Sequence, residues 1–135
     1  MDERRIALDT DASSLIFKKT LPSALEEKLA LATLVLPFVT CGELEAWRWI
    51  RDWGEARRKA LRDWMAEHTV LCGGEATAEV FGVISAASQR RGRPRSDNDT
   101  WIAACCIARK LALVTLNVKD FQDFAVHHGL ELITP

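Results

Sequence analysis

The segment IALDTD (residues 6–11) joins a short apolar run directly to two acids. An apolar run of this length, without alternating polar residues, is typical of a strand buried on both faces of a parallel sheet. A second segment, LALVTLNVKD (residues 111–120), has the same form. In parallel sheets the carboxyl ends of the strands meet at one edge, where such folds bind ligands. Two strands that end in polar groups therefore favour an α/β fold with a site at that edge.

Short apolar runs alternate with longer helical patterns over the whole chain. We expect strands over residues 5–8, 34–39, 69–72, 112–115 and 130–133. We expect helices over residues 10–17, 25–32, 40–53, 55–67, 75–90, 97–111 and 119–126. This alternation predicts one α/β domain over residues 1–135, with a central parallel sheet of about four to five strands and helices on both faces.

The composition excludes several classes of protein. The 135 residues are 48% apolar and 27% charged, with a net charge of −1, which is unlike an intrinsically disordered chain. No apolar run reaches the roughly 20 residues of a membrane span, and the charged start MDERRIALDTD does not have the form of a signal peptide. The four cysteines match no zinc-binding spacing, so we expect reduced, mostly buried thiols in a cytosolic protein: Cys41, Cys72, Cys105 and Cys106.

Acidic residues stand where predicted strands end or predicted helices begin. They are Asp9 with Asp11, Glu43, Asp97 with Asp99, and Asp120. Each has a purely structural explanation, since acids in a first helical turn complement the helix dipole. Thr40-x-x-Glu43 also has the form of a capping box, and Ser96-x-x-Asp99 resembles one.

Taken together, the acids indicate a metal site. If the sheet brings the strand ends together, three or four carboxylates share one crevice, and their mutual repulsion raises their pKa values unless a cation is bound. Ligation by oxygen alone, without His or Cys, suits Mg²⁺, for which Mn²⁺ can substitute. The chemistry that such a metal supports is hydrolysis of a phosphodiester by a metal-activated water.

Four motifs in order resemble those of the PIN-domain nucleases, in the branch of the VapC toxins of type II toxin–antitoxin modules. The segment from Ile6 to Ser14 resembles their opening strand and turn. The other three motifs are TCGEL (40–44), NDTWIAA (98–104) and LVTLNVKDF (113–121). The order, the spacing and the chain length all fit, and the resemblance covers essentially the whole chain.

The resemblance implies a Mg²⁺-dependent endoribonuclease of the cytoplasm with Asp9, Glu43 and Asp99 as its central acids. It leaves the fourth position open between Asn117, which stands where many relatives have an acid, and Asp120, which we take as the fourth catalytic and metal-binding acid. Asp11 stands where relatives often have Asn. Together with Asn117 and Thr115 we expect it to have an auxiliary role. The resemblance also implies a homodimer and a VapB-like antitoxin partner.

The uneven distribution of charge predicts where RNA would bind. Residues 48–95 carry a net charge of +4 and the rest of the chain −5. The densest basic stretch leads directly into Asp99, so we expect Arg93 and Arg95 to contact phosphates and Trp101 to stack on a base. Trp101 has an equally simple explanation as a core residue.

Two other interpretations remain open at this point. Asp9-Thr10-Asp11 also matches the DxD opening of haloacid-dehalogenase-type phosphatases. In that interpretation Asp97 and Asp99 correspond to the acidic motif that occurs later in the sequences of that family. Against it, the chain is short for that fold and no lysine is clearly placed to bind phosphate. The third interpretation is a PIN-fold binding module without catalytic activity.

Overall fold

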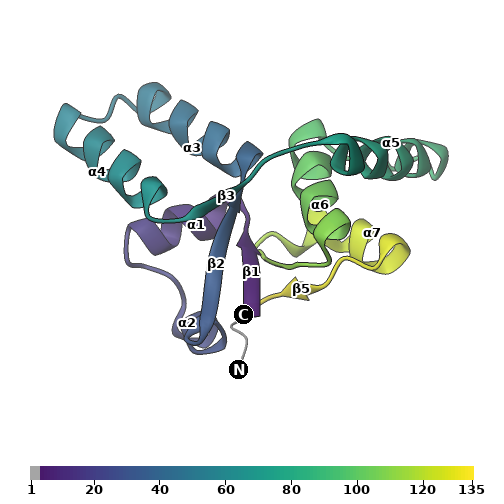
Figure 1. Ribbon diagram of the computed structural model, residues 1–135, viewed down its shortest axis with the longest axis horizontal. Coiled ribbons are helices and arrows are strands. Elements are labelled where there is room, and N and C mark those ends of the chain that lie inside the picture. Colours follow the sequence, from purple (N-terminus) through teal and green to yellow (C-terminus); the bar gives the residue numbers. More distant parts are fainter. Residues whose placement is uncertain (1–3) are drawn as a thin grey trace.

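Five parallel strands form a single sheet in the order β3-β2-β1-β4-β5 in the computed structural model, which describes residues 4–135. The strands are β1 (Arg4–Leu8), β2 (Ala32–Pro37), β3 (Thr69–Leu71), β4 (Ala112–Val114) and β5 (Leu132–Ile133). The helices are α1 (Thr10–Phe17), α2 (Ser23–Leu29), α3 (Phe38–Ile50), α4 (Glu55–Ala66), α5 (Glu75–Arg90), α6 (Asp97–Arg109) and α7 (Val118–His128). The predicted parallel α/β architecture is confirmed (Figure 1).

The central strand β1 is buried on both faces of the sheet. Ile6, Ala7 and Leu8 are each 1% exposed or less. Successive side chains of a strand point to opposite faces. Ile6 and Leu8 accordingly pack in one hydrophobic cluster, and Ala7 packs in the other.

Helices cover both faces of this sheet. On the face of Ile6 and Leu8, α1 and α2 contribute Ala12, Leu25 and Leu29 to the core. On the opposite face lie α5, α6 and α7, whose core residues are Ile84, Ile102, Ala103, Ala104, Cys106, Phe121 and Phe124. Figure 1 shows these two groups of helices on either side of the strands.

Helices α3 and α4 form an arm that extends beyond the sheet, at the upper left of Figure 1. The arm has a small hydrophobic cluster of its own, built on Leu44, Trp53 and Leu61. The four tryptophans of this region lie in different surroundings, because Trp53 is 9% exposed and Trp49 is 61% exposed. Trp47, on the same helix as Trp49, is only partly exposed.

The structure corrects two local predictions. Helix α3 begins at Phe38 after Pro37, with no side-chain cap, so Thr40 does not cap it as the capping-box pattern predicted. The Thr40 hydroxyl instead donates a hydrogen bond to the Leu8 carbonyl oxygen at 3.0 Å, which ties α3 to the end of β1. All four cysteines are free, but Cys72 is exposed rather than buried. Within residues 4–135 no helix is long and apolar enough to cross a membrane.

Candidate functional site

The strand order reverses between β1 and β4. From β1 the chain adds β2 and β3 on one side, and it then crosses to add β4 and β5 on the other. Ligands of open α/β sheets bind at such a reversal, beyond the carboxyl ends of the strands. Asp9 directly follows β1 and Thr115 directly follows β4, and the Asp9 amide donates to the Val114 carbonyl oxygen at 3.2 Å.

A pocket of about 180 Å³ opens at this point. We call it the carboxylate crevice, and its lining residues are Asp9, Thr10, Asp11, Glu43, Trp47, Asp99, Ile102, Asn117, Asp120 and Phe121. The structure therefore brings together all four acids that the sequence placed at the site.

Asp9 is the most buried acid of the crevice, at 3% exposure. It caps α1, and its Oδ1 accepts a hydrogen bond from the Ala12 amide at 2.8 Å. Burial raises the pKa of Asp9 to about 6, opposed by the hydrogen bond that the Thr115 hydroxyl donates to it and reinforced by the nearby charges of Asp11 and Asp99. A buried carboxylate with such a pKa is costly to keep ionised unless a cation accompanies it.

Glu43 reaches the crevice from the first turns of α3. Its Oε1 accepts a hydrogen bond from the Thr10 hydroxyl at 2.7 Å. This contact joins α3 to α1 directly beside Asp9. Thr10, the residue after Asp9, therefore holds Glu43 in position.

Asp99 enters from the start of α6. Ser96 caps this helix, and its hydroxyl oxygen accepts a hydrogen bond from the Asp99 amide at 3.2 Å, as the sequence pattern predicted. Burial raises the pKa of Asp99, and the negative charges of Asp120 and Glu43 raise it further, whereas Arg95 lowers it. Asp99 thus lies within electrostatic reach of two other acids of the crevice.

Both candidates for the fourth position line the crevice. Asp120 lies in the first turn of α7. Asn117 precedes this helix, and its side-chain amide donates a hydrogen bond to the Asp11 carboxylate. The Asn117 backbone amide donates to the Thr115 hydroxyl at 2.9 Å, so Thr115 links Asn117 to Asp9.

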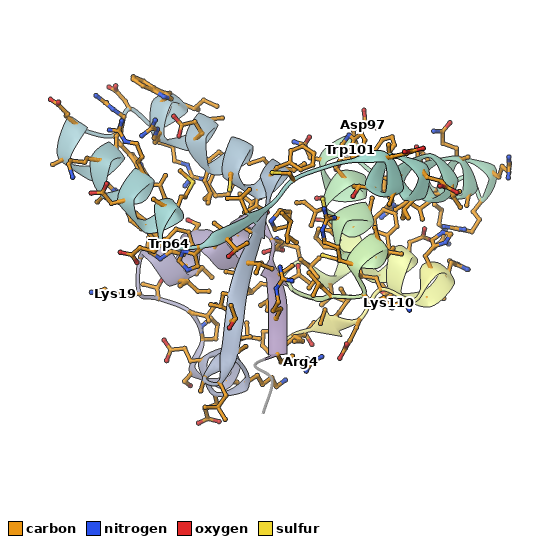
Figure 2. The ribbon with its side chains drawn as sticks, viewed as in Figure 1. Arg4, Lys19, Trp64, Asp97, Trp101 and Lys110 are labelled. Carbon is orange, nitrogen blue, oxygen red and sulfur yellow. The ribbon has the colours of Figure 1, made fainter. Side chains whose placement is uncertain are left out.

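Asp97 and Trp101 lie outside the lining of the crevice. Figure 2 shows both at the end of α6 that is opposite Lys110. Trp101 stacks on Phe81 with ring centroids 3.9 Å apart, so one face of its indole is covered by protein.

A basic pocket lies beside the crevice, on α7 and the loop before α6. Its volume is about 280 Å³, and its lining residues are Arg93, Arg95, Lys119, Gln122, Asp123, Val126 and His127. Arg95 donates to the Lys119 carbonyl oxygen at 3.3 Å. Arg91 donates to Asp123 and holds the pKa of that carboxyl below its usual range, so the one acid of the pocket is already paired. Arg93, Arg95 and Lys119 supply the positive charge.

The apolar part of the crevice wall is formed by residues for which the sequence predicts no role in the site: Trp47, Ile102 and Phe121. A signal for Trp47 was present, because it follows Glu43 by four residues and residues four apart share a helix face. The pattern alone does not separate a core residue from one that faces a site.

The donor set fits a hard divalent cation. The polar atoms of the crevice are carboxylate, hydroxyl and amide groups, with no His or Cys among the lining residues. Among the described residues, no three His, Cys, Asp or Glu side chains are already arranged as a ligand cluster. Mg²⁺ needs none, because it keeps several waters and is usually held by one or two carboxylates.

A model of the PIN domain family matches residues 6–134 of this chain. The chain therefore belongs to the PIN domain family, as its four acidic motifs indicated. It is similar to ribonuclease VapC1 of Haemophilus influenzae strain R2866, with 28% identity over 118 residues that cover 85% of this chain and 88% of the relative.

Solved structures share the same fold. One is VapBC2 from Rickettsia felis bound to a promoter DNA fragment, with a TM-score of 0.83, 20% identity and coverage of 97% of this chain and 98% of that chain. Another is VapBC-1 from nontypeable Haemophilus influenzae, with a TM-score of 0.82, 24% identity and coverage of 96% and 97%. The match of the PIN family model over nearly the whole chain disfavours the haloacid-dehalogenase interpretation. In the crevice, the Asp11 carboxylate accepts a hydrogen bond from the Asn117 side chain.

Proposed function

We propose that this protein is a Mg²⁺-dependent endoribonuclease of the VapC type, the toxin of a toxin–antitoxin module. The observation that carries the proposal is the convergence of five carboxylates on one crevice at the reversal of the sheet: Asp9 and Asp11 at the start of α1, Glu43 of α3, Asp99 of α6 and Asp120 of α7. The ribonuclease names of the similar proteins support the same activity.

In this proposal Asp9, Glu43, Asp99 and Asp120 hold the metal, with Mn²⁺ as a substitute for Mg²⁺. A divalent cation at this position polarises a phosphodiester and lowers the pKa of a bound water. The acids themselves need accurate placement. Thr10 provides it for Glu43, and Thr115 provides it for Asp9.

The basic pocket is the proposed binding site for the RNA backbone. Arg93 and Arg95 line this pocket, and Arg95 is near enough to Asp99 to lower its pKa. Phosphate contacts of this kind position a strand without reading its sequence. Trp101 has one face covered by Phe81, which leaves only the other face for a base.

The proposed partners follow from the solved relatives. Several of the similar structures are described as VapBC complexes, so we propose a VapB-like antitoxin, a homodimeric toxin and an RNA substrate met in the cytoplasm. The alternative of a PIN-fold module without activity predicts that the wild type does not cleave RNA in the presence of Mg²⁺.

The decisive experiment compares Asp99→Asn with Asp97→Asn. Both acids lie in the first turn of α6, but only Asp99 lines the crevice. Single-stranded RNA is incubated with each purified variant and Mg²⁺, and the cleaved ends are sequenced. We expect Asp99→Asn to abolish cleavage and Asp97→Asn to retain it. Cleavage by Asp99→Asn at the wild-type rate would contradict the proposal.

A second measurement tests the metal without relying on activity. Mg²⁺ should raise the melting temperature of the wild type and of Asp97→Asn, because a ligand that binds only the native state stabilises it. Asp99→Asn should show a much smaller shift. Equal shifts in all three proteins would place the metal elsewhere or nowhere.

A further inference from the structure

One face of α3 carries an acid, an aromatic ring and a cation in regular order. Glu43, Trp47 and Arg51 are spaced four residues apart, and Arg51 is the residue that ends the helix. Residues at this spacing share a helix face, and each step advances about 6 Å along the axis. The stripe therefore runs from the carboxylate crevice outward along the helical arm.

Trp47 is the partly exposed ring of the crevice wall. The other aromatic lining residue, Phe121, is 2% exposed, and the aliphatic Ile102 is also 2% exposed. Neither presents a face to a ligand. Trp47 packs against the small core of the arm and also lines the crevice.

The Arg51 guanidinium lies over this ring, 4.4 Å from its centroid. Arg51 is exposed, and within residues 4–135 its side chain forms no ion pair or hydrogen bond. Two other arginines that lie on tryptophans of the arm are held by the protein, since Arg48 donates to Glu45 and Arg58 donates to the Trp53 carbonyl oxygen. Arg51 is thus a cation beside a ring of the crevice wall, with its donors still available.

We propose that Trp47 stacks on a nucleobase next to the phosphate at the carboxylate crevice, and that Arg51 binds the following phosphate. This inference rests on the proposed nuclease function and extends it to the choice of substrate conformation. A base stacks on an aromatic ring only when it is unpaired and splayed out, so the substrate at this site is single-stranded RNA.

The order of groups on the helix supports RNA over a peptide. Along the stripe, the acids with their metal would bind one phosphate, the Trp47 ring would stack on the base, and the Arg51 guanidinium would bind the next phosphate. This order matches the order of groups along an RNA strand. Stacking also tolerates any base, so the ring adds affinity without fixing the cleavage sequence. A peptide that covers the same ring is the competing occupant, and it predicts no effect of the ring on RNA.

The test uses matched pairs of variants on the arm. Trp47→Leu removes the ring, Trp47→Phe keeps a stacking face, and Trp49→Leu removes a 61% exposed ring of the same helix that does not line the crevice. Arg51→Gln is paired with Arg57→Gln, because Arg57 lies over Trp53 at 4.0 Å but away from the crevice. Circular dichroism and thermal melting check that each variant is folded.

Binding is measured by fluorescence anisotropy with labelled oligoadenylate and oligouridylate, in an Asp99→Asn background that prevents cleavage. We expect Trp47→Leu to raise Kd by between about 5-fold and 150-fold for both strands, the range of one base stacked on one ring. Trp47→Phe should recover most of the affinity, and Trp49→Leu should match its parent. Arg51→Gln should weaken binding and reduce its salt dependence, whereas Arg57→Gln should not.

Cleavage of the same strands by variants with Asp99 intact separates the two proposals. Trp47→Leu should raise KM with a smaller effect on kcat. A wild type that cleaves RNA while a folded Trp47→Leu matches it in Kd and KM overturns this inference alone. A wild type that neither binds nor cleaves RNA overturns the proposed function and this inference with it.

Discussion

The side-chain amide of Asn117 donates a hydrogen bond to the carboxylate of Asp11, which joins the first turn of α1 to the start of α7 across the crevice. These residues are 106 positions apart in the sequence. The contact closes one side of the site with a neutral donor. The type of residue at position 117 therefore determines how much negative charge the metal-free crevice carries.

Asn117→Asp is expected to destabilise the metal-free protein by up to about 1 kcal/mol, because at this exposed contact a donor is replaced by a second carboxylate that faces Asp11. Mg²⁺ should recover much of this loss by neutralising the added charge. Urea denaturation with EDTA and with Mg²⁺ measures both effects. Gln122→Glu, an equal change of charge at an exposed position of α7, should change stability by less in either condition.

The stability of the metal-free protein should depend on pH through Asp9. Its pKa of about 6 in the folded state lies above the ordinary value near 3.8, so the folded state binds more protons between these two values. The contribution of Asp9 to stability is then fully present at or below about pH 4, is lost as the pH rises through 6, and amounts to on the order of 3 kcal/mol.

Asp9→Asn should remove this fall while keeping the helix cap, since Asn caps helices as well as Asp does. At pH 7.5 in EDTA the variant should be more stable than the wild type and inactive with Mg²⁺. Urea denaturation from pH 4 to pH 8 tests it, with Asp97→Asn as the control that keeps the wild-type profile. An unchanged slope in Asp9→Asn would show that another group causes the dependence.

Thr40→Val is expected to cost about 1–2 kcal/mol of stability, because it leaves the Leu8 carbonyl oxygen without its side-chain donor inside the core. Thr40→Ser keeps the hydroxyl and should retain most of that stability. If Thr40 capped α3 instead of bonding to β1, Thr40→Val would have only a small effect on stability, confined to α3. Chemical denaturation of both variants provides the measurement.

Arg95→Gln should raise KM for RNA and reduce the dependence of log KM on log salt by about 0.7, the change for one phosphate contact on a single strand. Arg90→Gln is the control, because Arg90 is exposed in the last turn of α5 and does not line the basic pocket. Titrations of salt from low to physiological concentration give both slopes. Equal slopes for the two variants would contradict a backbone contact by Arg95.

Much of the fold follows from local signals in the sequence. Helix α1 covers Thr10–Phe17 and α5 covers Glu75–Arg90, both with the predicted bounds. Asp9 and Gly74 mark their starts chemically, as a cap and as a break after β3. The parallel sheet follows from the same alternation, because strands separated by helices pair in parallel.

Tertiary contacts explain the differences. The sequence predicts that α3 starts at Thr40, whose spacing from Glu43 matches a capping box. The Thr40 hydroxyl instead donates to the end of β1, and Glu43 accepts a hydrogen bond from Thr10. Both partners come from elsewhere in the sequence, so no local pattern reveals them. The sequence likewise predicts the four acids at one edge of the sheet, but the spacing of Trp47 from Glu43 does not distinguish a core residue from one that lines the same crevice.

The position of β1 in the middle of the sheet has a consequence for synthesis on the ribosome. A nascent chain that has emerged through α5 already contains Asp9 and Glu43, but it lacks Asp99, Asp120 and the strand β4 that pairs with one side of β1. The crevice is complete only after residue 121 has emerged and packed. A nascent chain therefore cannot form the complete crevice until β4 and α7 have joined the domain.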